Sequence, residues 1–74
     1  MDHLEAYRRN LRRMAAEKNL TQKEIAIRAD ISETHVGMMM NGTRNPTLRT
    51  AVNVAHALGV TLSEMLEGAE YVEY

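Results

Sequence analysis

The chain has no cysteine, no tryptophan and no phenylalanine, and it has a single proline. Without cysteine it can form neither a disulfide framework nor a thiolate metal site, and this composition is compatible with the cytoplasm. No apolar run approaches the length of a membrane-spanning helix, and no signal-peptide pattern opens the sequence. We therefore expect a cytoplasmic protein that does not interact with a membrane.

Catalytic and metal-binding groups are also sparse. His3, His35 and His56 lie on different segments, and no pair has the i, i+3 or i+4 spacing of a helical chelate. The sequence has no glycine-rich phosphate loop and no nucleophile–base motif. We expect a protein without a metal or cofactor that is not an enzyme.

Apolar residues make up 45% of the 74 residues, which is enough for the core of one small domain. Because the only aromatic residues are three tyrosines, that core has to be built from aliphatic side chains and methionine. Met14, Met39, Met40 and Met65 fall on the buried faces of expected helices. We interpret them as core residues and not as a peptide-binding groove of flexible methionines.

Residues 21–42 predict two short helices joined by a tight turn. Thr21 is a suitable N-cap for the first, and Glu24 completes a capping box with it. Ser32 caps the second helix, which ends at Asn41 and Gly42 because both residues tolerate the left-handed conformation. The apolar positions Val36, Met39 and Met40 share one face of that second helix. Two helices in this relation form a helix-turn-helix.

The rest of the chain predicts three more helices. We expect helices at about 2–18, 22–29, 33–41, 48–58 and 62–67, with Asp2, Thr47 and Thr61 as further caps. Gly59 and Gly68 end the last two. Residues 1–68 then form one domain, and the tail 69–74 either contacts a second subunit or is disordered.

Charge is unevenly distributed although the net charge is only −1. All nine lysines and arginines lie between residues 8 and 49, against four acids there, which leaves that segment at about +5. A polarised molecule of this kind can present a cationic face to nucleic acid. The alternative is a solvated surface of mixed charge, and for Arg8, Arg9, Arg12 and Arg13 the two interpretations are both open.

Four motifs resemble one known family: LTQKEIA at 20–26, the Ile31-Ser32 turn, NGTRNPT at 41–47 and ALGVTLSEML at 57–66. In this order they resemble the phage-repressor helix-turn-helix family, also called Cro/repressor or XRE. The resemblance covers residues 8–67. It implies an all-α fold, a five-helix lambda-repressor-like domain. It also implies a regulator of transcription, here a repressor, that binds double-stranded DNA as a homodimer with the 33–41 helix in the major groove.

The resemblance also assigns roles to individual residues. The base-reading positions fall on Ser32, Glu33, Thr34 and Met38. The phosphate-binding positions fall on Gln22, Lys23, His35, Asn41, Thr43 and Arg44. The apolar end of the chain supplies candidate dimer contacts, which are Leu62, Met65, Leu66, Tyr71, Val72 and Tyr74.

Three positions depart from the family pattern. Asp30 replaces the usual glycine of the turn, which costs about 1 kcal/mol if the residue is left-handed. Ala15 and Met40 replace a common Arg–Glu ion pair, and we expect their side chains to pack together instead. Ile27 is apolar where relatives are polar. An exposed Ile27 and Met38 would also suit an alternative, a protein-interaction module of the same fold such as an antitoxin, which has a protein partner.

Overall fold

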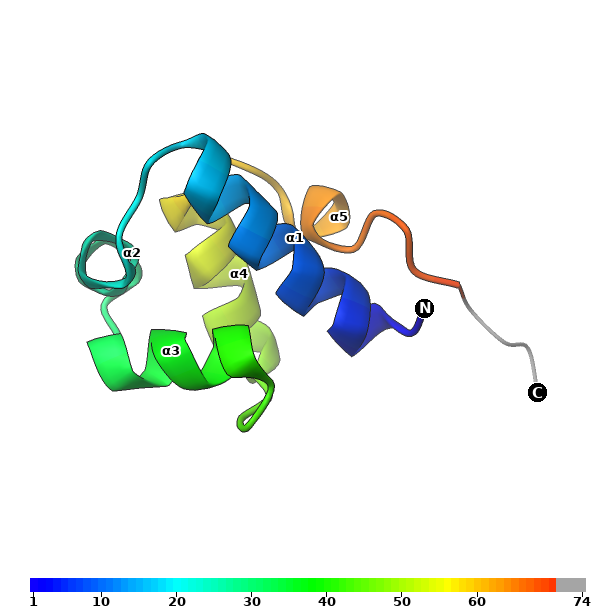
Figure 1. The fold of residues 1–74 in the computed structure, drawn as a ribbon, viewed down its shortest axis with the longest axis horizontal. Coiled ribbons are helices and arrows are strands. Elements are labelled where there is room, and N and C mark those ends of the chain that lie inside the picture. Colours follow the sequence, from blue (N-terminus) through cyan, green and yellow to red (C-terminus); the bar gives the residue numbers. More distant parts are fainter. Residues whose placement is uncertain (71–74) are drawn as a thin grey trace.

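A computed structural model describes residues 1–70 of the chain as five helices without a strand. They are α1 (His3–Glu17), α2 (Gln22–Ala29), α3 (Glu33–Asn41), α4 (Leu48–Ala57) and α5 (Leu62–Met65). The all-α architecture predicted from the sequence is therefore confirmed (Figure 1). Among residues 1–70, the longest helix is too short and too polar to cross a membrane.

Each helix begins at the cap residue that the sequence predicts. The side chains of Asp2, Ser32 and Thr47 accept hydrogen bonds from amides three residues on. Thr21 and Thr61 each form a complete capping box with the glutamate at the third helical position. These bonds satisfy amides that have no partner within the first turn of a helix, so local sequence fixes where all five helices start.

The last helix is shorter than expected: it ends at Met65, whereas the sequence predicts an end at residue 67. The Nδ2 group of Asn10, a buried side chain of α1, donates to the carbonyls of Met65 and Glu67, both at 2.9 Å. The amides of Leu66 and Glu67 turn back to the third residue before them, which is a tighter turn than an α-helix makes. Asn10 therefore binds the end of α5 from 55 residues away in the sequence.

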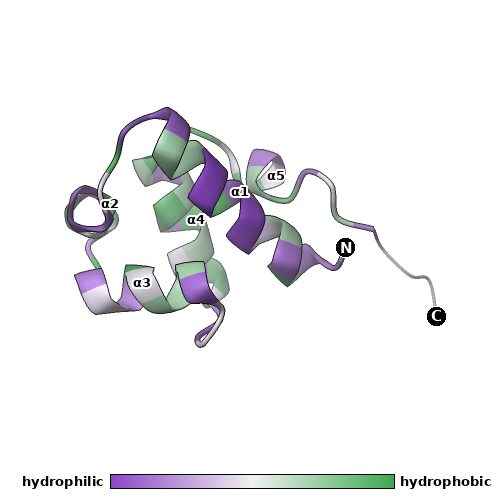
Figure 2. Cartoon of the chain, in the orientation of Figure 1, coloured by the Kyte–Doolittle hydropathy of each residue, from purple (hydrophilic) through white to green (hydrophobic). Residues whose placement is uncertain are grey.

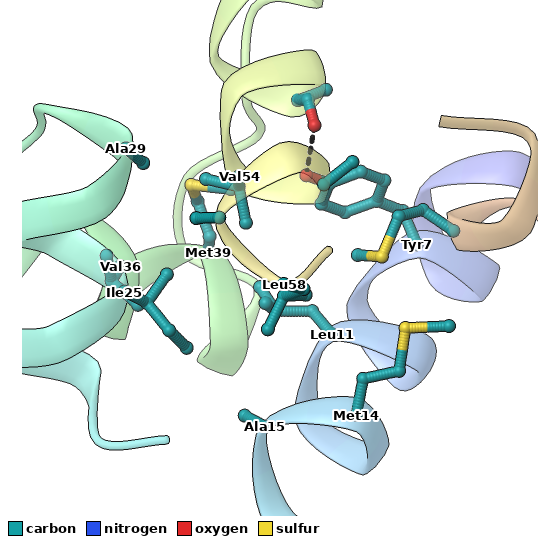
Figure 3. Packing of buried hydrophobic residues seen from close by; sticks show 14 of the residues in the cluster. Tyr7, Leu11, Met14, Ala15, Ile25, Ala29, Val36, Met39, Val54 and Leu58 are labelled. Atoms are coloured by element: carbon teal, nitrogen blue, oxygen red, sulfur yellow. Dashed lines mark hydrogen bonds between the residues drawn. The ribbon is translucent and has the colours of Figure 1, made fainter. Parts of the chain in front are cut away.

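The core lies where α1, α2, α3 and α4 meet, and its largest fully buried side chains are Leu11, Ile25, Val36, Val54 and Met65. Figure 3 shows these helices contributing aliphatic and methionine side chains to one continuous cluster. Within it the Tyr7 hydroxyl donates to the carbonyl of Ala51 at 2.8 Å, linking α1 to α4. Figure 2 shows that the polar residues of α1 form a separate outward stripe.

The two ends of the described chain lie together. The amide of Glu70 donates to the carbonyl of Met1 at 2.7 Å, and the Glu70 carboxylate lies 3.8 Å from the terminal amino group. The first residues of the predicted tail therefore contact the start of α1. Tyr71, Val72 and Tyr74, which the sequence suggests as dimer contacts, lie outside the described residues.

Candidate nucleic-acid interface

The turn between α2 and α3 is closed by a residue in the left-handed conformation. Asp30 has φ 58° and ψ 47°, and the next amide, that of Ile31, donates to the carbonyl of Ala26 at 3.0 Å. The suspected left-handed conformation of Asp30 is thus confirmed. Ala26 is buried and Ile31 is partly buried against the core, so the two helices are held in a fixed relation.

This arrangement gives α3 a buried side and an exposed side. Val36 and Met39 are buried. The four residues predicted to read bases, Ser32, Glu33, Thr34 and Met38, are all exposed. Met38 keeps 38% of its surface accessible although Met39 beside it keeps only 3%. No part of the described chain covers the exposed side, so a DNA groove can reach it.

Gln22, the first residue of α2, lies against α3. Its Oε1 atom is 2.9 Å from the point where a Cβ atom on Gly37 would lie. The glycine therefore makes room for the amide side chain of Gln22 between the two helices. In this position Gln22 braces α3, and its side chain is still exposed to a ligand.

The loop after α3 is held in shape by Asn41. Its Oδ1 atom accepts from the amide of Thr43 at 2.9 Å and from the Thr43 hydroxyl at 2.6 Å. These two bonds use only the oxygen of the Asn41 side chain, so its NH₂ group can still donate to a ligand. Arg44 follows at once and is exposed. The end of α3 thus presents the amide of Asn41 and the guanidinium of Arg44 as donors for phosphate groups, while the Thr43 hydroxyl donates its single proton to Asn41.

No carboxylate of residues 1–70 forms a salt bridge with the cations at this surface. Within residues 1–70 the salt bridges are Arg13–Glu17 and the terminal amino group with Glu70. Lys23 and Arg44 therefore keep their charges available for phosphates. The acids of the C-terminal quarter, such as Glu64 and Glu67, lie on or just after α5, away from α3 (Figure 1).

One predicted dimer contact is wrong, and one predicted phosphate contact is restricted by burial. Met65 has no exposed surface, because it is a central residue of the core, so it cannot be a dimer contact. The Nε2 atom of His35 is buried without a hydrogen-bond partner, which leaves only Nδ1 for the predicted phosphate contact. Leu62 and Leu66 are partly buried and keep some surface for a second copy.

One residue of this region was not singled out from the sequence. The guanidinium of Arg8, in α1, fills the space beside Gly42 at the end of α3. In the sequence Arg8 is one of four similar arginines, and its half-buried environment is a property of the fold. Only the arrangement of α1 on α3 distinguishes it from Arg9, which is exposed.

Two helices joined by a tight turn, with one side of the second helix exposed beside a donor-rich loop, form the arrangement of a helix-turn-helix protein. Comparison with known proteins agrees, because the helix-turn-helix family profile matches residues 10–65. The uncharacterised HTH-type transcriptional regulator y4dJ of Sinorhizobium fredii is 39% identical over 57 residues, covering 77% of this chain and 74% of the relative. The control protein C.MunI of a Mycoplasma species is 33% identical over 61 residues, covering 81% and 82%.

The fold is also similar to a solved structure. The crystal structure of the restriction-modification controller protein C.AhdI from Aeromonas hydrophila has a TM-score of 0.78 and 27% identity, covering 84% of this chain and 94% of that one. The chain therefore belongs to the XRE-type helix-turn-helix family of DNA-binding transcriptional regulators. The predicted family and fold are confirmed, and so is the prediction that the protein is a regulator and not an enzyme.

Proposed function

We propose that the protein is a repressor that binds a specific double-stranded DNA site as a two-fold dimer, with α3 of each copy in the major groove. The observation that carries this proposal is the exposed side of α3, which has hydrogen-bond donors beside it. Gln22 lies against the middle of α3 at Gly37, and the loop of Asn41, Thr43 and Arg44 follows the end of that helix. Relatives named as an HTH-type transcriptional regulator, a control protein and a controller protein support a regulatory role.

The exposed side of α3 offers few but distinct contacts to base edges. Glu33 can accept from the amino group of cytosine, and Thr34 can donate to a base or place its methyl group against thymine. Met38 has no polar donor, so it is suited to a thymine methyl group. Because these contacts are few, we propose that DNA shape and deformability contribute to the choice of site. Phosphate contacts from the flanking donors set the position and supply salt-dependent affinity.

The proposed dimer covers an apolar surface beside the start of α4. A hollow of about 220 Å³ lies between the start of α1, the start of α4 and α5. Its lining includes Leu4, Leu48, Leu62 and Leu66, and Leu48 exposes 73% of its surface. Two recognition helices related by a two-fold axis would then meet successive major grooves, about 34 Å apart. The cytoplasmic location expected from the sequence is part of this proposal.

Selection of bound sites from a random duplex pool tests the function. We expect a palindromic motif whose half-sites are about one helical turn apart. In a salt titration with the selected site, Arg44→Ala should lower the slope of log K against log salt by about one. Arg13→Ala is the matched control, because Arg13 is already paired with Glu17 at 3.1 Å. An absence of binding to any duplex at low salt would contradict the proposal and favour a protein-interaction module, for which Ile27, 71% exposed, is a candidate contact.

Sedimentation tests the dimer separately. Leu48→Gln should shift the protein towards monomer and weaken binding to the full palindrome while half-site affinity is retained. Ile27→Gln is the control, since Ile27 is equally exposed but lies on α2, outside the hollow. Equal dissociation of both variants, or of neither, would reject this dimer surface.

A further inference from the structure

The end of α3 is in contact with an arginine from another helix. Gly42, which ends α3, has φ +83°, and the guanidinium of Arg8 occupies the position that a Cβ atom on Gly42 would take. The Cζ and Cδ atoms of Arg8 lie 3.0 and 3.5 Å from that position, so the whole end of the side chain lies along the glycine. Arg8 is half-buried, whereas Arg9 and Arg12 of the same helix are exposed.

The location of this charge matters because α3 lacks a cation of its own. The last turn of α3 contains no basic residue. The last carbonyls of a helix carry the negative end of its dipole, and a positive charge close to them is stabilising. Arg8 supplies that charge from α1, which packs against α3 (Figure 1).

The same place is where the loop towards Arg44 is formed. The carbonyl of Met38 accepts from the amide of Gly42 and also from the amides of Thr43 and Arg44, at 3.1 and 3.3 Å. The amides of three successive residues therefore donate to one oxygen, and the guanidinium of Arg8 lies on the glycine that begins this turn. A shift of Gly42 would move both Thr43 and Arg44.

We propose that Arg8 is a positioning residue that holds the Gly42–Arg44 turn in the conformation in which it grips DNA. The proposal rests on the proposed function, because it assigns a role within that interface. Arg8 acts through the turn and does not itself contact a phosphate, since its guanidinium is packed on the protein backbone. Gly42 is then required for two reasons, its positive φ and the absence of a side chain in the space that Arg8 fills.

The first test uses the free protein and needs no DNA. Hydrogen exchange of the Thr43 and Arg44 amides is measured in wild type, Arg8→Met, which keeps the long stem without the charge, and Arg9→Met as the exposed control. We expect exchange at both amides to be about fivefold faster in Arg8→Met only, which corresponds to a helix-terminus charge interaction of about 1 kcal/mol. Arg8→Lys retains the charge and is expected to restore most of the protection. Equal exchange in Arg8→Met and Arg9→Met, or no recovery with lysine, would overturn the proposal.

The second test measures binding to the selected DNA site over a range of salt. Arg8→Met should weaken binding about fivefold at every salt concentration and leave the salt slope unchanged, because no phosphate contact is lost. A slope lower by about one would show that Arg8 contacts a phosphate directly and would overturn the positioning role. If wild type itself bound no DNA, the proposed function would fail, while the exchange comparison would still decide whether Arg8 holds the turn.

Discussion

The side-chain oxygen of Gln22 lies 2.9 Å from the point where a Cβ atom on Gly37 would lie. The amide of Gln22, from α2, therefore packs directly on the glycine of α3. Gln22 is the first residue of α2 and Gly37 is in the middle of α3. A glycine inside a helix normally lowers its stability by about 1 kcal/mol relative to alanine. The chain therefore keeps an unfavourable residue at the one place on α3 that receives Gln22.

Gly37→Ala should separate stability from DNA binding. The new methyl group favours the helix, so we expect the melting temperature to rise by roughly 4–8 °C for a gain of about 1 kcal/mol. The methyl group also displaces the amide of Gln22, so DNA affinity should fall. Thermal unfolding and DNA binding are measured in parallel. In a Gln22→Ala background the effect of Gly37→Ala on binding should be smaller, and equal effects in both backgrounds would disprove the coupling.

Asp30→Gly should stabilise the protein. Asp30 is exposed and left-handed at φ 58°, a conformation that glycine adopts without cost. We expect a gain of about 1 kcal/mol in the free energy of unfolding by urea. Asp30→Ala places a residue with a Cβ and no local hydrogen-bonding group in the same conformation and should lower stability. If glycine and alanine change stability in the same direction, backbone conformation is not the cause.

Tyr7→Phe should change the response to alkaline pH. Burial raises the pKa of the Tyr7 hydroxyl well above its ordinary value. The unfolded chain then loses this proton at a lower pH than the folded one. The contribution of the protonated Tyr7 hydroxyl to the free energy of unfolding is therefore complete below about pH 10, and it is lost as pH rises above that value.

In urea unfolding at about pH 8, the phenylalanine variant should be less stable by about 1 kcal/mol, because the hydrogen bond to Ala51 is missing. Above about pH 10 that difference should shrink, since only the wild type has a hydroxyl at this position to ionise on unfolding. A constant difference between the two proteins across this range would contradict the burial of a protonated hydroxyl.

Met40→Glu should destabilise the protein clearly. Met40 packs against the core, to which Ala15 also belongs, so a carboxylate at position 40 would lack the arginine that many relatives have at the position of Ala15. An unpaired charge at a partly buried position should cost about 2 kcal/mol or more. Met38→Glu is the matched control, because the same change two residues earlier is on the exposed side of α3. It should leave the melting temperature nearly unchanged and weaken DNA binding. An unchanged melting temperature for Met40→Glu would reject packing between Ala15 and Met40.

Local signals in the sequence were sufficient for the helices and for the exposed side of α3. Capping hydrogen bonds span three residues, so Thr21, Ser32 and Thr61 could be identified from their neighbours alone. The positive φ of Asp30 could be suspected because the turn of a helix-turn-helix usually requires it. The exposed position of Glu33, Thr34 and Met38 follows from helical periodicity once Val36 and Met39 are assigned to the core.

Contacts between distant segments could not be predicted in this way. Asn10 reaches the end of α5 across 55 residues, and Arg8 reaches Gly42 from another helix. Both residues lie among polar neighbours in the sequence, so neither periodicity nor composition distinguishes them. Met65 was expected both in the core and among the dimer contacts, and only the first expectation holds, because α5 places this side chain fully inside the core.

The rate at which the methionines of α3 are oxidised can report whether DNA covers this helix. Met38 is accessible while Met39 is almost completely shielded, and Met1, 41% exposed, lies at the far end of α1. Peroxide should therefore convert Met38 and Met1 to sulfoxides first. If a duplex groove receives α3, bound DNA should slow oxidation at Met38 and leave Met1 as an internal reference, so mass spectrometry of one natural protein can report where the ligand lies.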